Sequence, residues 1–395
     1  MAYNFDQIID RRHTDSAKWR WYSKDGTDVL PLWVADMDFA APEPVLRALE
    51  ERVTHGIFGY GLPPDGLCEV IQERLARLYG WRVETEDIFF VPGVVTGFNM
   101  VCHAVGAPGD DILVETPVYY PMLHAPGNAA RTCRIVPLVE GRERYEHDFG
   151  AFEQAILDAD AGRTSLFLLC NPHNPVGRVF DKTELERLAE ICLQNDVVIC
   201  SDEIHCDLVF QGHPHTPISS LAPEVAAQTV TLFAPSKTYN VAGLSCSVCV
   251  VQNPDLRARV QQAGAGLVSH VNVMGYTAAL AAYCDGQEWL DEVLIYLEAN
   301  CDYLLEYIGT HMPGIKCQKP EGTYLAWLDC REANIPGNPH EFFLEQAKVA
   351  LNDGAAFGAG GEGFVRLNLG CPRSTLTEAL ERMRAAMEQV SESAS

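Results

Sequence analysis

Seven short apolar segments recur between residues 88 and 251, and they constrain the fold more than any other feature of the chain. Several are apolar throughout, without the polar–apolar alternation of a strand that has one face in water. Strands of this kind belong to a parallel sheet covered by helices on both faces, and residues 182–194 have the spacing of such a helix. The pattern therefore predicts an α/β domain with a mainly parallel sheet. The segments are 88–91, 112–115, 134–138, 165–170, 197–201, 230–233 and 246–251.

The C-terminal part of the chain has a different pattern of apolar and polar residues. After residue 254, long helical segments continue to about residue 309. Two short strand patterns, 324–328 and 364–369, then flank a predicted helix at 340–352, and a last helix is expected from Thr375. This mixture predicts a second, smaller α+β domain.

The N-terminal residues form neither kind of pattern. They begin polar and then become apolar, but Asp36 and Asp38 interrupt the apolar run, which predicts an arm lying in a groove. We therefore expect an arm at 1–45 that joins the small domain, a large domain at 46–285 and the small domain at 286–395.

Charge and composition exclude several classes of partner. The chain has 54 acidic and 29 basic residues and a formal net charge of −25 at pH 7, so nucleic acids and anionic bilayers would be repelled. No apolar run reaches the length of a membrane span. Its 14 cysteines are scattered, and the first residues lack the pattern of a signal peptide, so we expect a cytoplasmic protein.

Two pairs of residues have the spacing of metal ligands. Cys246 and Cys249 lie in an apolar strand without a second pair, and His213 and His215 lack further ligands nearby. We therefore expect the cysteines to be buried, the histidines to lie at the surface, and no metal site to be present.

Lys237 follows the apolar segment 230–233 on a turn of small residues. In open α/β sheets, ligands bind beyond the carboxyl ends of the strands. An amine in a partly desolvated pocket there favours its neutral form and can condense with a carbonyl group to a Schiff base. Taken alone, a solvated lysine in a turn is the commoner case.

Groups at four other strand ends favour a chemical role for Lys237 over that of a solvated lysine in a turn. Asp202 would be a buried carboxylate, for which a protonated pyridine nitrogen is a suitable partner. Asn174 can donate to a phenolate oxygen, and the ring of Tyr119 can stack on a planar group. Gly93 opens a helix whose free amides suit a phosphate. Each group has an ordinary structural explanation alone, but together they are what pyridoxal 5′-phosphate needs.

At this point the sequence resembles the fold-type I pyridoxal phosphate-dependent enzymes, over essentially its whole length. The order of the groups along the chain matches as well. The resemblance implies that Tyr119 stacks on the cofactor ring and that Asn174 contacts its phenolate oxygen. It implies that Asp202 pairs with the pyridine nitrogen and that Lys237 forms the Schiff base.

The same resemblance implies further contacts. Backbone amides of Val94 and Val95, together with Ser236, would hold the phosphate. Tyr60 would reach the phosphate from a partner subunit, which implies a homodimer. Arg366 would bind the substrate carboxylate, with Ala35 and Asn174 also at the substrate.

Two segments are similar to the MalY/PatB branch of cystathionine β-lyases within this family. They are residues 33–39, Trp-Val-Ala-Asp-Met-Asp-Phe, and residues 202–207, Asp-Glu-Ile-His-Cys-Asp. In the second segment, His205 stands where many aminotransferases carry a tyrosine on the phenolate oxygen. Ser245 stands where many carry an arginine on the phosphate.

This branch implies a carbon–sulfur β-lyase. Such an enzyme cleaves L-cystathionine or a related cysteine S-conjugate to a thiol, pyruvate and ammonia. Two alternatives remain open at this stage: an aminotransferase of class I/II, and a regulatory protein that binds pyridoxal phosphate and acts through a protein partner. The sequence does not distinguish which cysteine S-conjugate is preferred.

Overall fold

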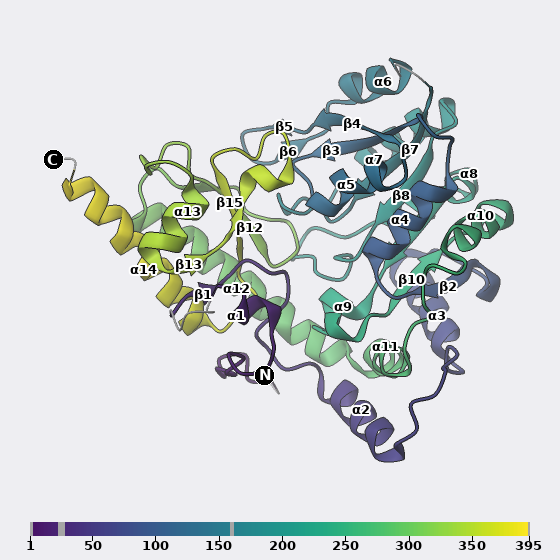
Figure 1. Ribbon diagram of the computed structural model, residues 1–395, viewed down its shortest axis with the longest axis horizontal. Coiled ribbons are helices and arrows are strands. Elements are labelled where there is room, and N and C mark those ends of the chain that lie inside the picture. Colours follow the sequence, from purple (N-terminus) through teal and green to yellow (C-terminus); the bar gives the residue numbers. More distant parts are fainter. Residues whose placement is uncertain (1–2, 23–27, 159–161, 394–395) are drawn as a thin grey trace.

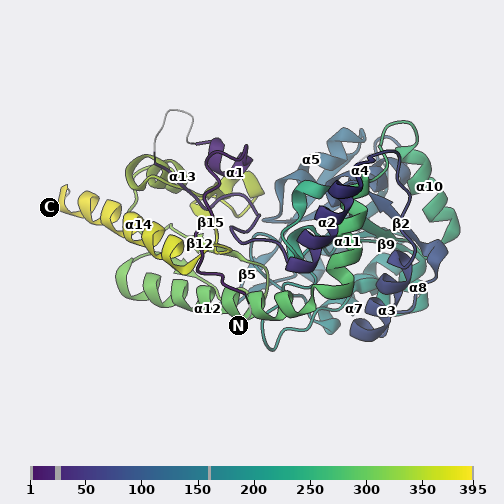
Figure 2. The same ribbon diagram turned by 90° about the horizontal axis from the view of Figure 1, so that it is seen from below.

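The computed structural model describes residues 3–22, 28–158 and 162–393. Figures 1 and 2 show two lobes, and the long helix α12 (Gln287–His311) leads from one to the other. The larger lobe is built on a seven-stranded sheet and the smaller on a four-stranded sheet. The fold is that of the α/β class predicted from the sequence, with a mainly parallel central sheet.

All seven predicted strands are present in the large sheet. Every neighbouring pair is parallel except those made by β10, which runs antiparallel to both of its neighbours. The predicted boundaries agree with the observed ones to within two residues. In spatial order the strands are β2 (Ile88–Val91), β10 (Ser247–Val250), β9 (Thr229–Phe233), β8 (Val198–Asp202), β7 (Thr164–Cys170), β3 (Asp111–Thr116) and β4 (Thr132–Pro137).

Helices cover both faces of this sheet, which explains why its central strands are apolar at nearly every position. Strands β7 and β9 are buried along their whole length. One face carries α4 (Val94–Ala104), α5 (Tyr120–Asn128) and α10 (Pro254–Gly264). The other face carries α3 (Leu67–Tyr79), α6 (Phe149–Leu157), α7 (Lys182–Gln194) and α11 (Val273–Asp285).

The smaller lobe is an antiparallel sheet packed against long helices. Its strands, in spatial order, are β11 (Lys316–Cys317), β12 (Leu325–Asp329), β15 (Phe364–Asn368) and β14 (Asn352–Asp353). Helix α12 and the last helix, α14 (Arg373–Ser393), pack on one another beside it. The N-terminal arm joins this lobe through β1 (Leu30–Pro31), which pairs with β13 (Val349–Ala350).

The predicted helix at 340–352 is wrong in its second half. A helical turn, α13 (Pro339–Phe342), continues as one π-helical turn over Phe343–Ala347, and Lys348 then adopts a positive φ of 56°. That conformation ends the helix. The residues that follow enter β13 and β14, because their backbone groups pair with the arm and with β15.

The histidine prediction is wrong for one of its two residues. His213 is exposed, but His215 is buried and its Nε2 lies 2.9 Å from Oε2 of Glu203. Cys246 and Cys249 are buried, as expected. Within the described ranges, no three histidine, cysteine or acidic side chains form a group that could hold a metal ion.

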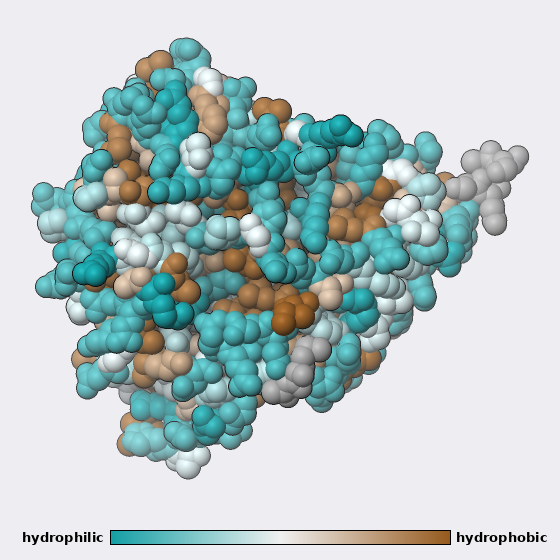
Figure 3. Space-filling model, turned by 180° about the vertical axis from the view of Figure 1, so that it is seen from behind, coloured by the Kyte–Doolittle hydropathy of each residue, from teal (hydrophilic) through white to brown (hydrophobic). Residues whose placement is uncertain are grey.

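Most of the surface seen from behind is hydrophilic, and hydrophobic residues gather near its middle (Figure 3). In the part of the chain that the structure describes, no helix has the length and hydrophobicity of a membrane span.

The remaining elements are short or lie at the periphery. They are α1 (Ala17–Arg20), α2 (Glu43–His55), α8 (Pro223–Ala227), α9 (Pro235–Thr238), the β5–β6 hairpin (Val139–Glu140 and Tyr145–Glu146), and 3₁₀ turns at Thr85–Asp87, Ile218–Ser220, Ala242–Leu244 and Gly354–Phe357.

Candidate active site

A cavity of about 290 Å³ lies where the carboxyl ends of the parallel strands meet the smaller lobe and the N-terminal arm. Strand β10 is antiparallel, so its first residues reach the same edge. Ten of the eleven site residues predicted from the sequence line this cavity, and Tyr60 does not. The ten are Ala35, Val94, Val95, Tyr119, Asn174, Asp202, His205, Ser236, Lys237 and Arg366.

Lys237 projects into the cavity from α9, the single helical turn that follows β9. Its Nζ donates a 2.6 Å hydrogen bond to the backbone carbonyl oxygen of Ala35. Removal from bulk water lowers the pKa of this amine to about 8, with Arg366 acting in the same direction. A substantial fraction of the amine is therefore neutral near pH 8 and able to accept a proton.

Asp202 is the last residue of β8 and is only 4% exposed. Its Oδ1 accepts a 3.0 Å hydrogen bond from the backbone N–H of Ile204. No cation of the described residues forms an ion pair with it, and burial raises its pKa to about 7. Among the residues that the structure describes, Lys237 is the one cation that lowers this pKa, and it does so without forming an ion pair, so a protonated ring nitrogen fits beside the carboxyl group.

Arg366 enters the cavity from β15 and is also buried. It donates 2.9 Å and 2.8 Å hydrogen bonds to Asn174 Oδ1 and to the carbonyl oxygen of Trp33, and a further bond to Asn352. All three acceptors are neutral, and burial lowers the pKa of Arg366 to about 10. Because no carboxylate of the described residues pairs with it, the guanidinium keeps an uncompensated positive charge that suits an anionic ligand group.

A second feature suited to an anion is the start of α4. Val94 and Val95 are its first two residues, and their backbone amides have no carbonyl partner within the helix. Such a helix start favours negative charge. Ser236 lines the same cavity, as do Ser245, which follows the 3₁₀ turn Ala242–Leu244, and Ser247, the first residue of β10.

Tyr119 and His205 supply rings to the cavity wall. Tyr119 precedes α5, its centroid lies 5.1 Å from that of Tyr120, and burial raises the pKa of its phenol to about 12. His205 is 3% exposed, and burial lowers its pKa to about 3, so it is neutral near pH 7. Its Nδ1 has no hydrogen-bond partner among the described residues.

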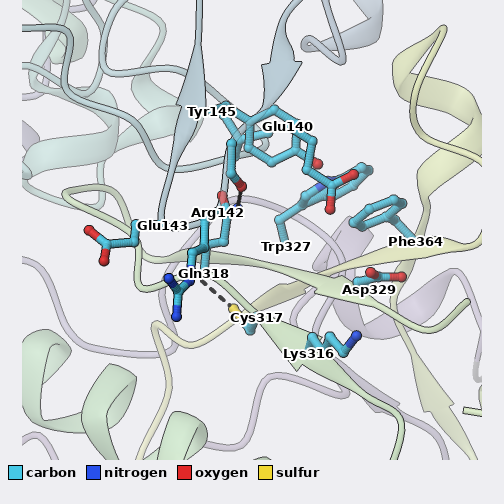
Figure 4. A pocket seen from close by; sticks show the side chains of 12 residues that line it. Glu140, Arg142, Glu143, Tyr145, Lys316, Cys317, Gln318, Trp327, Asp329 and Phe364 are labelled. Atoms are coloured by element: carbon cyan, nitrogen blue, oxygen red, sulfur yellow. Dashed lines mark hydrogen bonds between the residues drawn. The ribbon is translucent and has the colours of Figure 1, made fainter. Parts of the chain in front are cut away.

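A larger cavity of about 510 Å³ lies elsewhere, between the β5–β6 hairpin and the four-stranded sheet (Figure 4). Gln318 spans it at one end, donating a 2.8 Å hydrogen bond to the carbonyl oxygen of Gly141. Its charged residues include Lys316, paired with Glu332 at 2.8 Å, and Asp329, paired with Arg331 at 2.8 Å. It contains none of the predicted residues, so we assign the site to the smaller cavity.

Comparison with known proteins agrees with this geometry. Residues 27–383 match the family described as aminotransferase class I and II. The chain belongs to this aminotransferase family. The family resemblance inferred from the sequence is thereby confirmed.

Several relatives within the aminotransferase family match the chain along nearly its whole length. The cystathionine beta-lyase PatB of Bacillus subtilis (strain 168) is 42% identical, and the match covers 97% of this chain and 100% of PatB. The crystal structure of cystalysin from Treponema denticola, which contains pyridoxal 5′-phosphate, superposes with a TM-score of 0.93 at 33% identity, covering 99% of this chain and 100% of cystalysin. A PLP-bound C-S lyase from Staphylococcus hominis in complex with L-cycloserine gives a TM-score of 0.92 at 32% identity, covering 98% of each chain.

Four residues at the site of this aminotransferase-family chain received no role from the sequence. Trp33 and Asn352 hold Arg366, Tyr324 Oη donates a 2.9 Å hydrogen bond to the Ala35 carbonyl oxygen, and the buried Ser247 hydroxyl has no partner among the described residues. Trp33 belongs to segment 33–39, which is similar to the MalY/PatB branch, but that similarity did not assign it a contact. Asn352 was placed in the predicted helix 340–352 and Tyr324 in the predicted strand 324–328, so neither was predicted to be a site residue.

Tyr60 lies on the loop between α2 and α3, away from the cavity of its own chain. Its side chain is fully exposed. Three apolar neighbours on the same loop, Ile57, Phe58 and Leu62, are 57–85% exposed. Such a cluster of exposed apolar side chains is typical of a protein–protein contact.

Proposed function

We propose that this protein is a pyridoxal phosphate-dependent carbon–sulfur β-lyase. It cleaves L-cystathionine or a related cysteine S-conjugate by α,β-elimination to a thiol, pyruvate and ammonia. The observation that carries the proposal is the convergence of Lys237, Asp202 and Arg366 on one cavity, in a chain 42% identical to a cystathionine beta-lyase.

The donors and charges around the cavity fit pyridoxal phosphate. Asp202 would pair with the pyridine nitrogen, because this buried carboxyl group forms no ion pair with any described residue. The amides of Val94 and Val95 with Ser236 would hold the phosphate.

The wall residues would contact the rest of the cofactor. Tyr119 would lie against the ring, and Asn174 and His205 would contact its phenolate oxygen. When bound, the cofactor supplies an electron-withdrawing ring that stores the electron pair left by loss of the substrate's α-proton.

Lys237 would hold the cofactor through its aldehyde group and would also move the proton of the substrate. Its Nζ takes the proton from the substrate Cα, and a pKa near 8 leaves enough neutral amine for this role. The Ala35 carbonyl oxygen, 2.6 Å away, orients the amine in the cavity. No other lysine lines the cavity within the described ranges.

Arg366 binds the α-carboxylate of the amino-acid substrate. A pKa of about 10 keeps it charged at neutral pH, and its neutral hydrogen-bond partners fix the plane of the guanidinium without cancelling its charge. Asn174 uses its oxygen to accept from Arg366, which leaves its amide N–H groups to donate toward the ligands. Ala35 forms the neighbouring wall.

The working unit is a homodimer in which the partner subunit's Tyr60 reaches the cofactor phosphate. The exposed apolar loop that carries Tyr60 supports an interface at this position. Each chain divides into an arm at 1–45, a large domain at 46–285 and a small domain at 286–395. The pairing of β1 with β13 supports the assignment of the arm to the small domain.

The protein works in a reducing compartment such as the cytoplasm. All 14 cysteines are free, and ten of them are buried. The strong negative charge argues against nucleic acid as a partner.

The proposal is tested by incubating the purified, cofactor-loaded protein with L-cystathionine in the absence of any oxo acid. Continuous release of thiol and pyruvate is expected. An aminotransferase would stop after one half-reaction per site, because it needs an oxo acid to restore the cofactor, and a regulatory protein would not turn over at all. The Lys237→Ala variant is the control for cofactor-only chemistry.

A further inference from the structure

A cluster of two basic and two acidic residues lies on the N-terminal arm, next to the turn that lines the active-site cavity. Lys18 and Asp38 are buried, whereas the side chains of Arg11 and Asp36 are 23% and 22% exposed. Lys18 in α1 has a side chain that is 0% exposed, and its Nζ lies 2.7 Å from Oδ2 of Asp38 and 3.4 Å from Oδ1 of Asp36. Arg11 pairs with the same two carboxylates, at 2.7 Å in each case. The four formal charges cancel, so each charge in the cluster has a partner of opposite sign.

The cluster holds the turn that provides acceptors to the active site. Lys18 Nζ also donates a 3.1 Å hydrogen bond to the backbone carbonyl oxygen of Asp36. The preceding residue, Ala35, presents its carbonyl oxygen to Lys237 Nζ at 2.6 Å. The amine of Lys237 is thus one residue away from a backbone group that Lys18 binds directly.

Lys18 holds the same turn from its other side as well. Its own carbonyl oxygen accepts a 3.1 Å hydrogen bond from Trp33 Nε1, and the carbonyl oxygen of Trp33 accepts from Arg366 at 2.8 Å. Lys18 itself does not line the cavity, because its side chain has no exposed surface.

We propose that Lys18 is a positioning residue for Lys237, holding the turn at residues 34–37 so that the Ala35 carbonyl oxygen orients the amine. The inference rests on the role proposed for Lys237. It also assigns a function to Asp36 and Asp38, the two aspartates of segment 33–39. They anchor the arm through Lys18 and Arg11, and the backbone between them faces the reaction.

Burial has the largest effect on the pKa of Lys237 and lowers it, and the cluster contributes to the charges that act on the amine. Three charged groups act on the amine: Asp36 from the arm and Asp202 from β8 raise its pKa, and Arg366 from β15 lowers it. Removing Lys18 would leave Asp36 and Asp38 with one cation, so the excess negative charge should favour protonated Lys237. Removing the charge of Asp38 should have the opposite effect.

The test measures the titration of Lys237 in the cofactor-free protein, by competitive labelling with acetic anhydride from pH 6 to pH 11. The Lys237 peptide is quantified by mass spectrometry. The wild-type midpoint is expected near 8. Lys18→Met should raise it by about one unit and Asp38→Asn should lower it, whereas Lys18→Arg should stay near the wild type because it keeps the charge.

Lys182→Met is the matched control, since it removes an exposed lysine that pairs with Glu186 on α7, far from the cluster. In the loaded enzyme, Lys18→Met should lower kcat more than it raises KM and should move the pH–rate profile in the direction of the labelling midpoint. Opposite shifts for Lys18→Met and Asp38→Asn are a result that general loss of structure does not produce.

An unchanged Lys237 midpoint in folded Lys18→Met would overturn the proposal. If that variant does not fold, the nearly isosteric Asp38→Asn decides by itself, and a midpoint equal to that of the wild type or higher overturns it. The labelling needs no turnover, so it is separate from the proposed function. Absence of pyruvate release by the wild type would refute the lyase while leaving the labelling result intact.

Discussion

Replacing Asp202 with asparagine separates the contribution of this carboxylate to folding from its contribution to the proposed reaction. Asp202 is buried at the end of β8, with one backbone hydrogen bond and no ion-pair partner among the described residues. An ionised carboxylate in such a place destabilises the cofactor-free fold. Asparagine keeps the shape, and its side-chain oxygen can still accept from Ile204.

The size of the effect follows from the pKa of Asp202. Burial raises it from its ordinary value of 3.8 to about 7, and this difference of about three units corresponds to about 4 kcal/mol. Because the folded chain holds the proton more tightly than the unfolded chain, stability is lost as the pH rises from about 4 to 7. At pH 8 nearly the whole penalty is present, whereas at pH 5 it is below about 2 kcal/mol.

Urea denaturation of the cofactor-free proteins at pH 5 and pH 8, at equal protein concentration, measures this difference. Asp202→Asn is expected to unfold at higher urea than the wild type, with a larger gain at pH 8 than at pH 5. Asp111→Asn is the matched control: Asp111 is also buried but pairs with Arg134 at 2.6 Å, so its loss should destabilise the protein.

The loaded Asp202→Asn enzyme should behave in the opposite way. Without the negative charge, the pyridine nitrogen loses its proton more readily, and kcat should fall by orders of magnitude with a smaller change in KM. A variant that is no more stable than the wild type at pH 8 would contradict the reasoning about burial. Near-normal kcat would remove Asp202 from the reaction.

Three further predictions concern the other cavity residues and the interface. Lys237→Ala should reduce elimination by at least ~10²–10⁴-fold, and borohydride should no longer fix the cofactor to the chain; labelling of another lysine would refute the assignment. Arg366→Met should raise KM by roughly 10–100-fold, as expected for a lost charge-assisted pair of about 1.5–3 kcal/mol, with Arg366→Lys intermediate; an unchanged KM would place the substrate carboxylate elsewhere. Sedimentation should give a dimer, and Tyr60→Phe should release the cofactor more readily on dialysis without changing the sedimentation coefficient; a fully active, cofactor-retaining monomer would exclude a site shared between subunits.

The architecture of the larger lobe was predictable from the sequence because its signal is local. Strands β3, β7, β9 and β10 are short, mostly apolar runs that are buried along their whole length, so each can be recognised from its own residues without knowledge of its neighbours. The carboxyl-end rule then points to Lys237 and Asp202, since all parallel strands end at one edge. The prediction was wrong at residues 348–352. Their spacing is that of a helix, but most of them form strands because they pair with the arm and with β15.

The sequence by itself determined the strand pattern, the order of the chemical groups along it and, through the resemblance, the family. Only the tertiary structure decided how these groups are charged and oriented. Lys237 bonds to Ala35 across 202 residues of chain, and Arg366 to Asn174 across 192, so neither contact has a local pattern that spacing could reveal. The low pKa of Lys237 and the raised pKa of Asp202 depend on burial, which is a property of the packed fold rather than of any segment.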